Sequence, residues 1–285
     1  MSDGRRTPSA RAGRGRIRTS VVAMTCLLRR VPFFFRARPR TPLRVLGIVA
    51  LDALHVIRTS QPLPRRRAQE LALFLDFQGC ANAAWDHKAL SRTDYHAIQD
   101  ALDVAGLGAC IDSYLRRLRA LEGRRPPIGG DHGRFDEIRA YREDVARLVF
   151  ETAAAIALAP GPVRDDVPEI ETDSDVDALV RVLLQCQIID DVLDYKEDLS
   201  GGLPSYLTGC ASLAEAFELT AGAARSYGAR RDAVCPLRLS LSAATLAARC
   251  VVAIAAWASS FGLASALTGP RLGGRAGGPP SARQQ

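Results

Sequence analysis

The sequence lacks the residue patterns that thiol, zinc and nucleotide chemistry require. Its seven cysteines are dispersed without a CxxC pair, and its four histidines show no metal-binding spacing. No nucleophile motif and no glycine-rich phosphate loop stands out. These absences argue against a zinc site and a disulfide framework, and they favour a reducing compartment. We therefore expect a cytoplasmic protein.

The sequence also lacks the alternation of apolar and polar residues that is typical of strands. Apolar residues instead recur with helical spacing in five segments, 65–90, 94–106, 109–123, 135–159 and 174–199. Helix-end signals agree with this periodicity: Ser91–Asp94 and Ser212–Glu215 fit capping boxes, and glycines at 106, 123 and 201–202 are typical of helix ends. The fold class predicted is all-α.

Positive charge is concentrated at one end of the chain. Residues 1–45 contain twelve arginines and one acid, a net +11, so the remaining 240 residues carry −4 of the overall +7. We expect a disordered Arg-rich segment over 1–45, one helical domain over 46–268, and a loose Gly/Pro-rich tail over 269–285. We expect the basic segment to be a leader or to precede a true start at Met24, with a targeting peptide or a peripheral contact with an anionic membrane as the alternative; we expect no nucleic-acid partner.

Residues 250–267 contain no charged side chain over eighteen positions. That length approaches a membrane span, but the high Ala/Ser content makes the segment only weakly apolar. A large helical bundle needs buried helices of this kind, so we expect a buried helix, with a membrane span as the alternative.

The stretch "QCQIIDDVLDYKEDLSGG", 185–202, gathers carboxylates directly after an apolar run. On one continuous helix, Asp190, Asp194 and Asp198 share a face, with Gln187 one turn before and Asp191 beside it. A solvated acidic face is the simple interpretation. However, partly buried carboxylates need neutralisation, and an all-oxygen site indicates Mg²⁺.

Gln187 to Asp194 resembles the QxxDDxxD motif of trans-prenyltransferases, the polyprenyl synthetases of the class I isoprenoid synthase superfamily. The continuation "DYKEDLSGG" is similar to the DxxED…G segment of squalene and phytoene synthases. The resemblance implies a single-domain helical bundle with a central cavity and a prenyl diphosphate substrate. It also implies that Asp190 and Asp194 are catalytic, that Asp190, Asp191, Asp194 and Asp198 bind Mg²⁺, and that Gln187 binds substrate.

The resemblance implies a second acidic motif on an opposing helix, and no intact DDxxD is present. The nearest candidate is "NAAWD", in which Asn82 would bind substrate and Asp86 would be a catalytic metal ligand. Gln78, Asn82 and Asp86 form a polar stripe at i, i+4 and i+8, and Asp76 is a less well spaced alternative. The same stripe is also compatible with a polar helix edge or with buried amides satisfied by neighbouring helices.

A diphosphate group also needs cationic contacts. Arg142 and Arg147 lie on a helix between the two motifs, and Lys88 follows Asp86. We name these three as substrate-binding candidates, with ordinary surface salt bridges as the alternative.

The function predicted is Mg²⁺-dependent ionisation of an allylic prenyl diphosphate, for prenyl transfer or head-to-head coupling in isoprenoid biosynthesis. Two alternatives stay open: a non-catalytic partner subunit or lipid-binding protein of the same fold, and a terpene cyclase. A homodimer is compatible with either. The sequence does not define the length of the substrate or product chain.

Overall fold

The computed structural model describes residues 42–87, 92–130, 132–159, 174–229 and 233–260. Every regular element in these ranges is a helix, which confirms the all-α fold class. The elements are α2 (Pro42–Thr59), α3 (Arg65–His87), α4 (Arg92–Val104), α5 (Gly108–Glu122), α6 (His132–Leu158), α7 (Ser174–Leu193), α8 (Tyr195–Gly201), α9 (Leu213–Gly228) and α10 (Cys235–Ser260).

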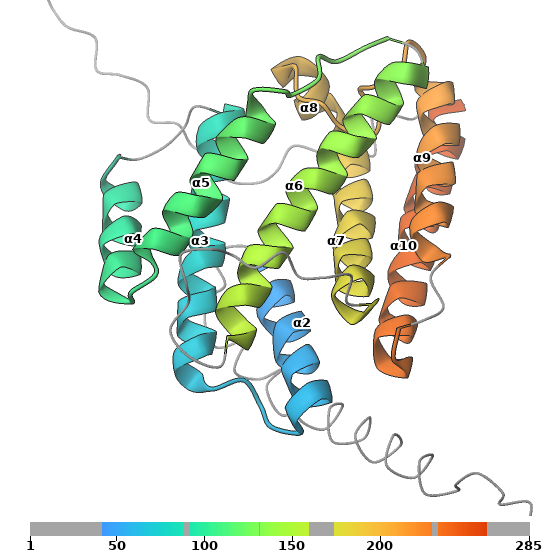
Figure 1. Ribbon diagram of the computed structural model, residues 1–285. Helices are drawn as coiled ribbons and strands as arrows, with labels where there is room; N and C mark the ends of the chain where they lie inside the picture. The colour runs from blue at the N-terminus through green and yellow to red at the C-terminus, as the bar shows by residue number, and fades with distance from the viewer. Residues whose placement is uncertain (1–41, 88–91, 131, 160–173, 230–232, 261–285) are drawn as a thin grey trace, which may run out of the picture.

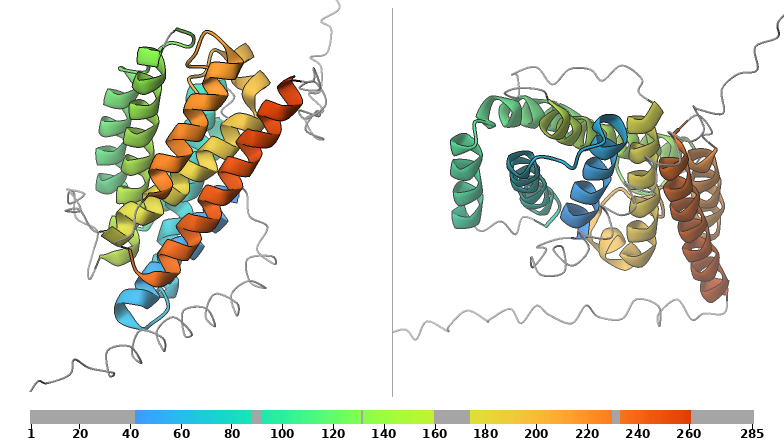
Figure 2. Two further views of the ribbon diagram at one scale, coloured as in Figure 1. Left: turned by 90° about the vertical axis from the view of Figure 1, so that its right-hand side faces the viewer. Right: turned by 90° about the horizontal axis from the view of Figure 1, so that it is seen from below.

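Helix α6 is the centre of the bundle. It packs against α2, α3 and α5 on one side and against α7 on the other (Figure 1). Helices α9 and α10 lie beyond α7 and form the far side of the molecule, as Figure 2 also shows. The acidic segment therefore belongs to an interior helix, because α7 is covered by α6, α9 and α10.

The core is built from large apolar side chains that recur every three or four residues. On α3, Leu71, Phe74 and Phe77 are completely buried, and the Phe74 ring meets Tyr114 of α5 edge to face at 5.2 Å. Aromatic pairs in this arrangement stabilise a core by about 0.5–1.5 kcal/mol beyond their buried area.

Two of the predicted helix ends have the expected geometry. Ser212 precedes α9, and its side chain accepts a hydrogen bond from the Glu215 backbone N–H. Gly202 ends α8 in the left-handed conformation, with φ +66°, which a residue with a Cβ adopts only at a cost. These two confirm the predicted boundaries.

The helix predicted over 174–199 is interrupted at Asp194. Helix α7 ends at Leu193, α8 begins at Tyr195, and Asp194 has φ −99° and ψ 10°. Backbone hydrogen bonds still join Asp194 to Asp190 and Asp198 to Asp194, so the chain turns without losing its i, i+4 bonding. The expectation of one continuous helix was wrong, and the acidic segment spans two helices.

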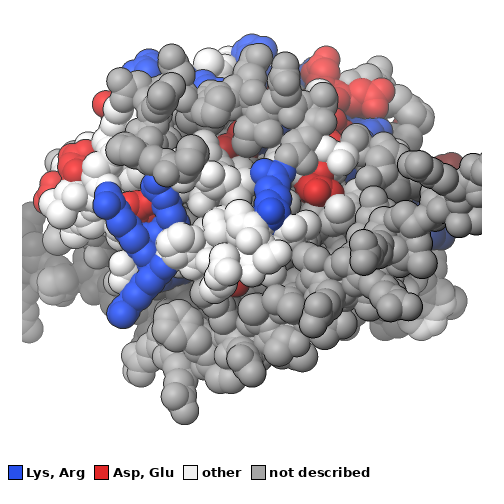
Figure 3. Space-filling model, turned by 60° about the horizontal axis from the view of Figure 1, so that its bottom comes forward, with Lys and Arg blue, Asp and Glu red and all other residues white. Residues whose placement is uncertain are grey.

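Helices α3 and α7 run in the same direction, so their C-terminal ends lie at the same end of the bundle (Figure 1). At the opposite end, the N-terminal turn of α3 carries Arg66 and Arg67, which pair with Glu70 at 2.7 Å. Figure 3 shows from this side that the described positive and negative side chains are interspersed among uncharged ones.

Helix α10 corrects the expectation of a buried helix over 250–267. Between 250 and 260 only Val252 and Ala258 are buried, while Ile254 and Trp257 are 56% and 60% exposed. The helix packs on α7 and α9 by one face only. Among the described residues, Pro236–Ser260 is the one helix that is long and apolar enough to cross a membrane, by length and composition alone. Residues 261–267 lie outside the described ranges.

A small cavity lies between α2, α3, α6 and α7. Its volume is about 40 Å³, and its lining is entirely apolar, with Leu51, Leu75, Phe150 and Leu183 among the contributors. Pockets that bind drug-sized ligands usually measure about 300–1,000 Å³. The cavity is far smaller than an isoprenoid chain requires.

The predicted boundaries at 45 and 268 fall mostly outside the described ranges. Helix α2 begins at Pro42, and residues 1–41 and 261–285 are not among those described.

Candidate functional site

The acidic segment runs from the end of α7 through the break at Asp194 into α8, and a buried loop follows it. Asp190 and Asp191 are in the last turn of α7, Asp194 is at the break, and Asp198 is on α8. The loop that follows, 203–209, turns back into the bundle, and its residues 204–209 are all buried. The carboxylates consequently differ widely in exposure.

Asp191 is the most deeply buried of these carboxylates, with 2% of its side chain exposed. Its Oδ1 forms an ion pair with the Arg142 guanidinium of α6, and its Oδ2 accepts a hydrogen bond from the Tyr206 backbone N–H at 2.8 Å. Burial raises the pKa of Asp191, while Arg142 and the Tyr206 N–H act in the opposite direction. Both oxygens of Asp191 are therefore engaged within the protein.

Tyr206 extends this contact into a network that reaches α9. Its hydroxyl lies 2.9 Å from that of Tyr227, which donates to Glu143 Oε1 at 2.7 Å. Arg139 of α6 donates to the same Glu143 oxygen at 2.9 Å and lies over the Tyr227 ring at 5.1 Å. Hydrogen bonds of this kind fix α6, α9 and the 203–209 loop relative to one another.

The sequence interpretation did not identify this network. Its two tyrosines stand in stretches with no chemical motif, and Glu143 and Arg139 are spaced like an ordinary helical ion pair. The available signal was the uncharged run "LPSYLTG", 203–209, directly after the carboxylates. Surface loops are usually polar, so an uncharged loop indicates burial.

Asp198 also has a shifted acidity. Burial and the negative charge of Asp191 raise its pKa, Arg142 and a hydrogen bond from Ser205 oppose them, and the net pKa is about 7. A half-buried carboxyl of this kind exchanges its proton near neutral pH. A cation bound nearby would lower the pKa of Asp198 and favour its ionised form.

Asp190 is exposed and Asp194 is half-buried. Within the part of the chain that the structure describes, no three His, Cys, Asp or Glu side chains lie close enough to hold a metal ion together. The expected cluster of four metal-binding aspartates is thus divided: Asp191 turns inward to Arg142, and Asp190, Asp194 and Asp198 do not converge among themselves. Any metal site here needs oxygen atoms from another source.

Two buried polar atoms beside Asp191 have no hydrogen-bond partner among the described residues. One is Oε1 of Gln187, one turn earlier on α7, and the other is Nε of Arg142. An unsatisfied buried polar atom costs about 1–3 kcal/mol, so native structures contain few of them. An acceptor and a donor left open in one region indicate a place for a polar ligand.

Helix α3 also carries buried polar atoms without a described hydrogen-bond partner. Gln78 is 8% exposed and its Oε1 is unsatisfied, and Oδ1 of Asp76 is also buried without a described partner. The other Asp76 oxygen accepts from Arg44 of α2 at 2.8 Å. The polar stripe therefore begins inside the bundle and not on a solvated edge.

The backbone of α3 gives the positions of Asn82 and Asp86, the other two residues of the stripe. Helix α3 continues to His87, so Asn82 and Asp86 lie on the same helix face as Gln78. Their side chains are outside the described set, and Lys88 lies outside the described residues altogether.

Arg147 lies away from the acidic segment. Its guanidinium is 3.6 Å from Asp177, in the first turn of α7, and Asp177 also pairs with Arg181 at 2.7 Å. Asp177 precedes Asp191 by fourteen residues, about 21 Å along a helix axis. Of the two arginines named from the sequence, the structure brings only Arg142 to the carboxylates.

Comparison with family models, with curated proteins and with solved structures finds no match to this chain.

Proposed function

We propose that the chain is a Mg²⁺-dependent isoprenoid synthase of the class I fold, which ionises an allylic prenyl diphosphate for prenyl transfer or head-to-head coupling. The observation that carries the proposal is the pair of open polar atoms beside Asp191, the acceptor Oε1 of Gln187 and the donor Nε of Arg142. Gln187 is the first residue of the QxxDDxxD segment, where the resemblance places substrate, and Arg142 of α6 pairs with Asp191, the second aspartate of that segment. A diphosphate oxygen would satisfy the Arg142 donor, and a water bound to Mg²⁺ would donate to the Gln187 acceptor.

The ligand chemistry of the site suits Mg²⁺, because the available donors are carboxylate oxygens alone. Because Asp190, Asp194 and Asp198 do not converge on one another, they would share the ion only together with diphosphate oxygens and Asp86 of α3. The parallel course of α3 and α7 supports this, because it puts both acidic ends at one end of the bundle (Figure 1). When bound, Mg²⁺ supplies Lewis-acid stabilisation of the diphosphate leaving group.

The chain's own residues would orient the substrate and exclude water. Arg142 stays positively charged: burial lowers its pKa, but Asp191, Tyr206 and Asp198 more than offset this. The charge would attract the diphosphate, and the apolar cavity between α2, α3, α6 and α7 begins one turn before Gln187, at Leu183. A prenyl tail would enter there only if the lining side chains move, because about 40 Å³ holds little more than one water molecule.

Two observations favour the non-catalytic alternative, a partner subunit or lipid-binding protein of the same fold. Asp191, the second aspartate of the motif, is held by Arg142 and Tyr206, and the cavity is small. In that case the acidic segment would serve to anchor α6, and water molecules would form the missing hydrogen bonds to Gln187 Oε1 and Arg142 Nε.

The test is product analysis with the purified full-length protein. It is incubated with Mg²⁺ and geranyl, farnesyl or geranylgeranyl diphosphate, with and without isopentenyl diphosphate. The proposal expects a longer or coupled isoprenoid, lost in Asp190→Ala and retained in the matched surface control Asp112→Asn, since Asp112 is exposed on α5. Mg²⁺-dependent binding of a diphosphate without any product would support the non-catalytic relative.

A further inference from the structure

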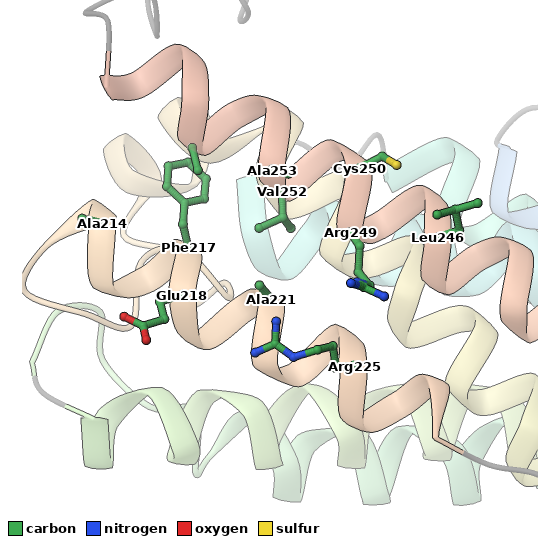
Figure 4. Close-up of a pocket in the computed structure, with 11 residues that line it drawn as sticks. Ala214, Phe217, Glu218, Ala221, Arg225, Leu246, Arg249, Cys250, Val252 and Ala253 are labelled. Atoms are coloured by element: carbon green, nitrogen blue, oxygen red, sulfur yellow. The ribbon is translucent and has the colours of Figure 1, made fainter.

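A groove runs between α9 and α10 on the side of the molecule away from α3. Its volume is about 600 Å³, within the range of ligand pockets. Phe217 and Ala221 of α9 face Val252 of α10 across it (Figure 4), and Ala256 of α10 also lines it. The groove is therefore mainly apolar, and it lies on the opposite side of α7 from α3, whose Asp86 belongs to the proposed diphosphate site.

Two arginines enter the groove from its opposite walls. Arg225 extends from α9 and Arg249 from α10, and both guanidinium groups point into the space between the helices (Figure 4). Neither forms an ion pair within the described ranges, and the acid that lines the groove, Glu218, lies further along α9. Two like charges that face a shared space repel each other unless an anion sits between them.

The groove opens onto an exposed apolar face of α10. Leu246 lines the groove and is 63% exposed, and Trp257, three turns further on the same helix side, is 60% exposed. Leu239 and Ile254 add to this surface at 64% and 56% exposure. Tryptophan next to aliphatic and arginine side chains is the composition found where proteins meet the interface of a membrane.

We propose that this surface binds an anionic lipid bilayer. A lipid phosphate lies between Arg225 and Arg249, its acyl chain follows the Phe217–Val252 side of the groove, and Trp257 enters the interface. Residues 235–260 contain two arginines and no acid, so a symmetric contact between two copies through α10 would bring like charges together. An anionic surface matches this charge.

The bilayer contact lies along α10, and the helix stays in the bundle. Leu237, Leu241 and Ala248 are buried against the neighbouring helices, and Gln185 of α7 donates to Thr245 of α10 at 3.0 Å. Crossing the membrane would separate these contacts. The inference does not depend on the proposed enzymatic function, because it uses none of the same residues.

The test is binding of the full-length protein to vesicles of phosphatidylcholine with and without phosphatidylglycerol, measured by sedimentation. We expect binding to the anionic vesicles, and a loss of about tenfold or more in Arg225→Gln/Arg249→Gln. The matched control is Arg116→Gln/Arg119→Gln on α5, which removes the same charge from another exposed surface and should change binding less than about twofold. Equal losses in both double variants would overturn the proposal, because net charge alone would then account for binding. Undiminished binding in both would overturn it as well, because the Arg-rich residues 1–45 would then be the site of contact.

Tryptophan fluorescence tests the depth of the contact. The sequence has two tryptophans, so Trp85→Phe leaves Trp257 as the single reporter. Its emission should shift to shorter wavelength on anionic vesicles and not with a water-soluble short-chain phosphatidylglycerol below its micelle concentration. Resistance of the bound protein to alkaline extraction would overturn the proposal in favour of a spanning α10. A dimer by light scattering that Trp257→Ala dissociates, without vesicle binding, would overturn it in favour of self-association.

Discussion

The carboxylate of Asp191 on α7 and the guanidinium of Arg142 on α6 form a buried ion pair. The second oxygen of Asp191 holds the backbone of Tyr206, and through it the loop that closes this end of the bundle. The acidic segment therefore has two roles in our account. Asp191 fixes the architecture, and the proposal assigns Asp190, Asp194 and Asp198 to the ligand.

Replacing Asp191 should damage the fold. Asp191→Asn leaves the mostly buried Arg142 without its counter-charge, and breaking a buried pair from one side costs about 3–5 kcal/mol. Urea unfolding should show this loss. Arg142→Met/Asp191→Leu removes both charges, so much of the stability should return. A free-energy loss in the double variant equal to the sum of the losses in the two single variants would show that the pair is not coupled.

Asp190→Asn provides the contrast to Asp191→Asn. Asp190 is exposed, so its replacement should change the free energy of unfolding by less than about 0.5 kcal/mol. It should nevertheless weaken the stabilisation of the protein by Mg²⁺ with a prenyl diphosphate, measured as the shift in melting temperature. A large loss of stability in Asp190→Asn would contradict this division of roles.

Stability should depend on pH through Asp198. Its pKa rises from 3.8 in the unfolded chain to about 7 in the folded protein, so the folded state binds the extra proton. The contribution is complete below pH 4 and is lost as the pH rises from about 4 to about 7. Asp198→Asn should accordingly be more stable than the parent at pH 8 and differ little at pH 4, as thermal melts at the two values will show.

Mg²⁺ should compete with that proton. If Asp198 is a metal ligand, Mg²⁺ with a prenyl diphosphate should raise the melting temperature more at pH 8 than at pH 6 in the parent protein, because only the ionised carboxylate binds the metal. In Asp198→Asn the difference between the two pH values should shrink. An equal shift at both pH values in the parent would place the metal elsewhere.

We expect Gln187 to serve ligand binding and to lower the stability of the ligand-free protein. Because its Oε1 is buried without a described partner, Gln187→Leu should raise the free energy of unfolding by about 1 kcal/mol in the absence of ligand. It should also weaken stabilisation by Mg²⁺ with a prenyl diphosphate, because the lost amide oxygen would accept a hydrogen bond from a metal-bound water. Gln185→Leu is the matched control, since the Gln185 amide donates to the Ala224 carbonyl at 2.7 Å. That change should destabilise the protein, and destabilisation by Gln187→Leu as well would argue for an ordinary structural glutamine.

The helical elements could be predicted because they depend on local patterns. Apolar spacing and end signals defined α3 to α6 and the starts of α7 and α9 to within a few residues. The break at Asp194 could not be predicted, because the i, i+4 spacing of the aspartates is the same on a straight and on a bent helix. The exposure of α10 could not be predicted either, because an uncharged Ala-rich helix is compatible with the core and with the edge of a bundle.

The candidate site was predictable as a segment and not as a set of contacts. The motif located Gln187 and the aspartates, but which aspartate turns inward depends on the position of α6 and of the 203–209 loop. Asp191 and Arg142 are 49 residues apart, and Asp191 and Tyr206 are 15 apart across a buried turn. Such pairings follow from the packed bundle and leave no local pattern in the sequence.

Release of pyrophosphate from farnesyl diphosphate by the full-length protein in the presence of Mg²⁺ tests the central claim most directly. The account predicts release that requires the metal, falls by at least about a hundredfold in Asp190→Ala and in Asp86→Ala, and persists in Asp112→Asn. Release at the same rate in Asp190→Ala and Asp86→Ala, or no release together with no Mg²⁺-dependent binding of the diphosphate, would contradict it.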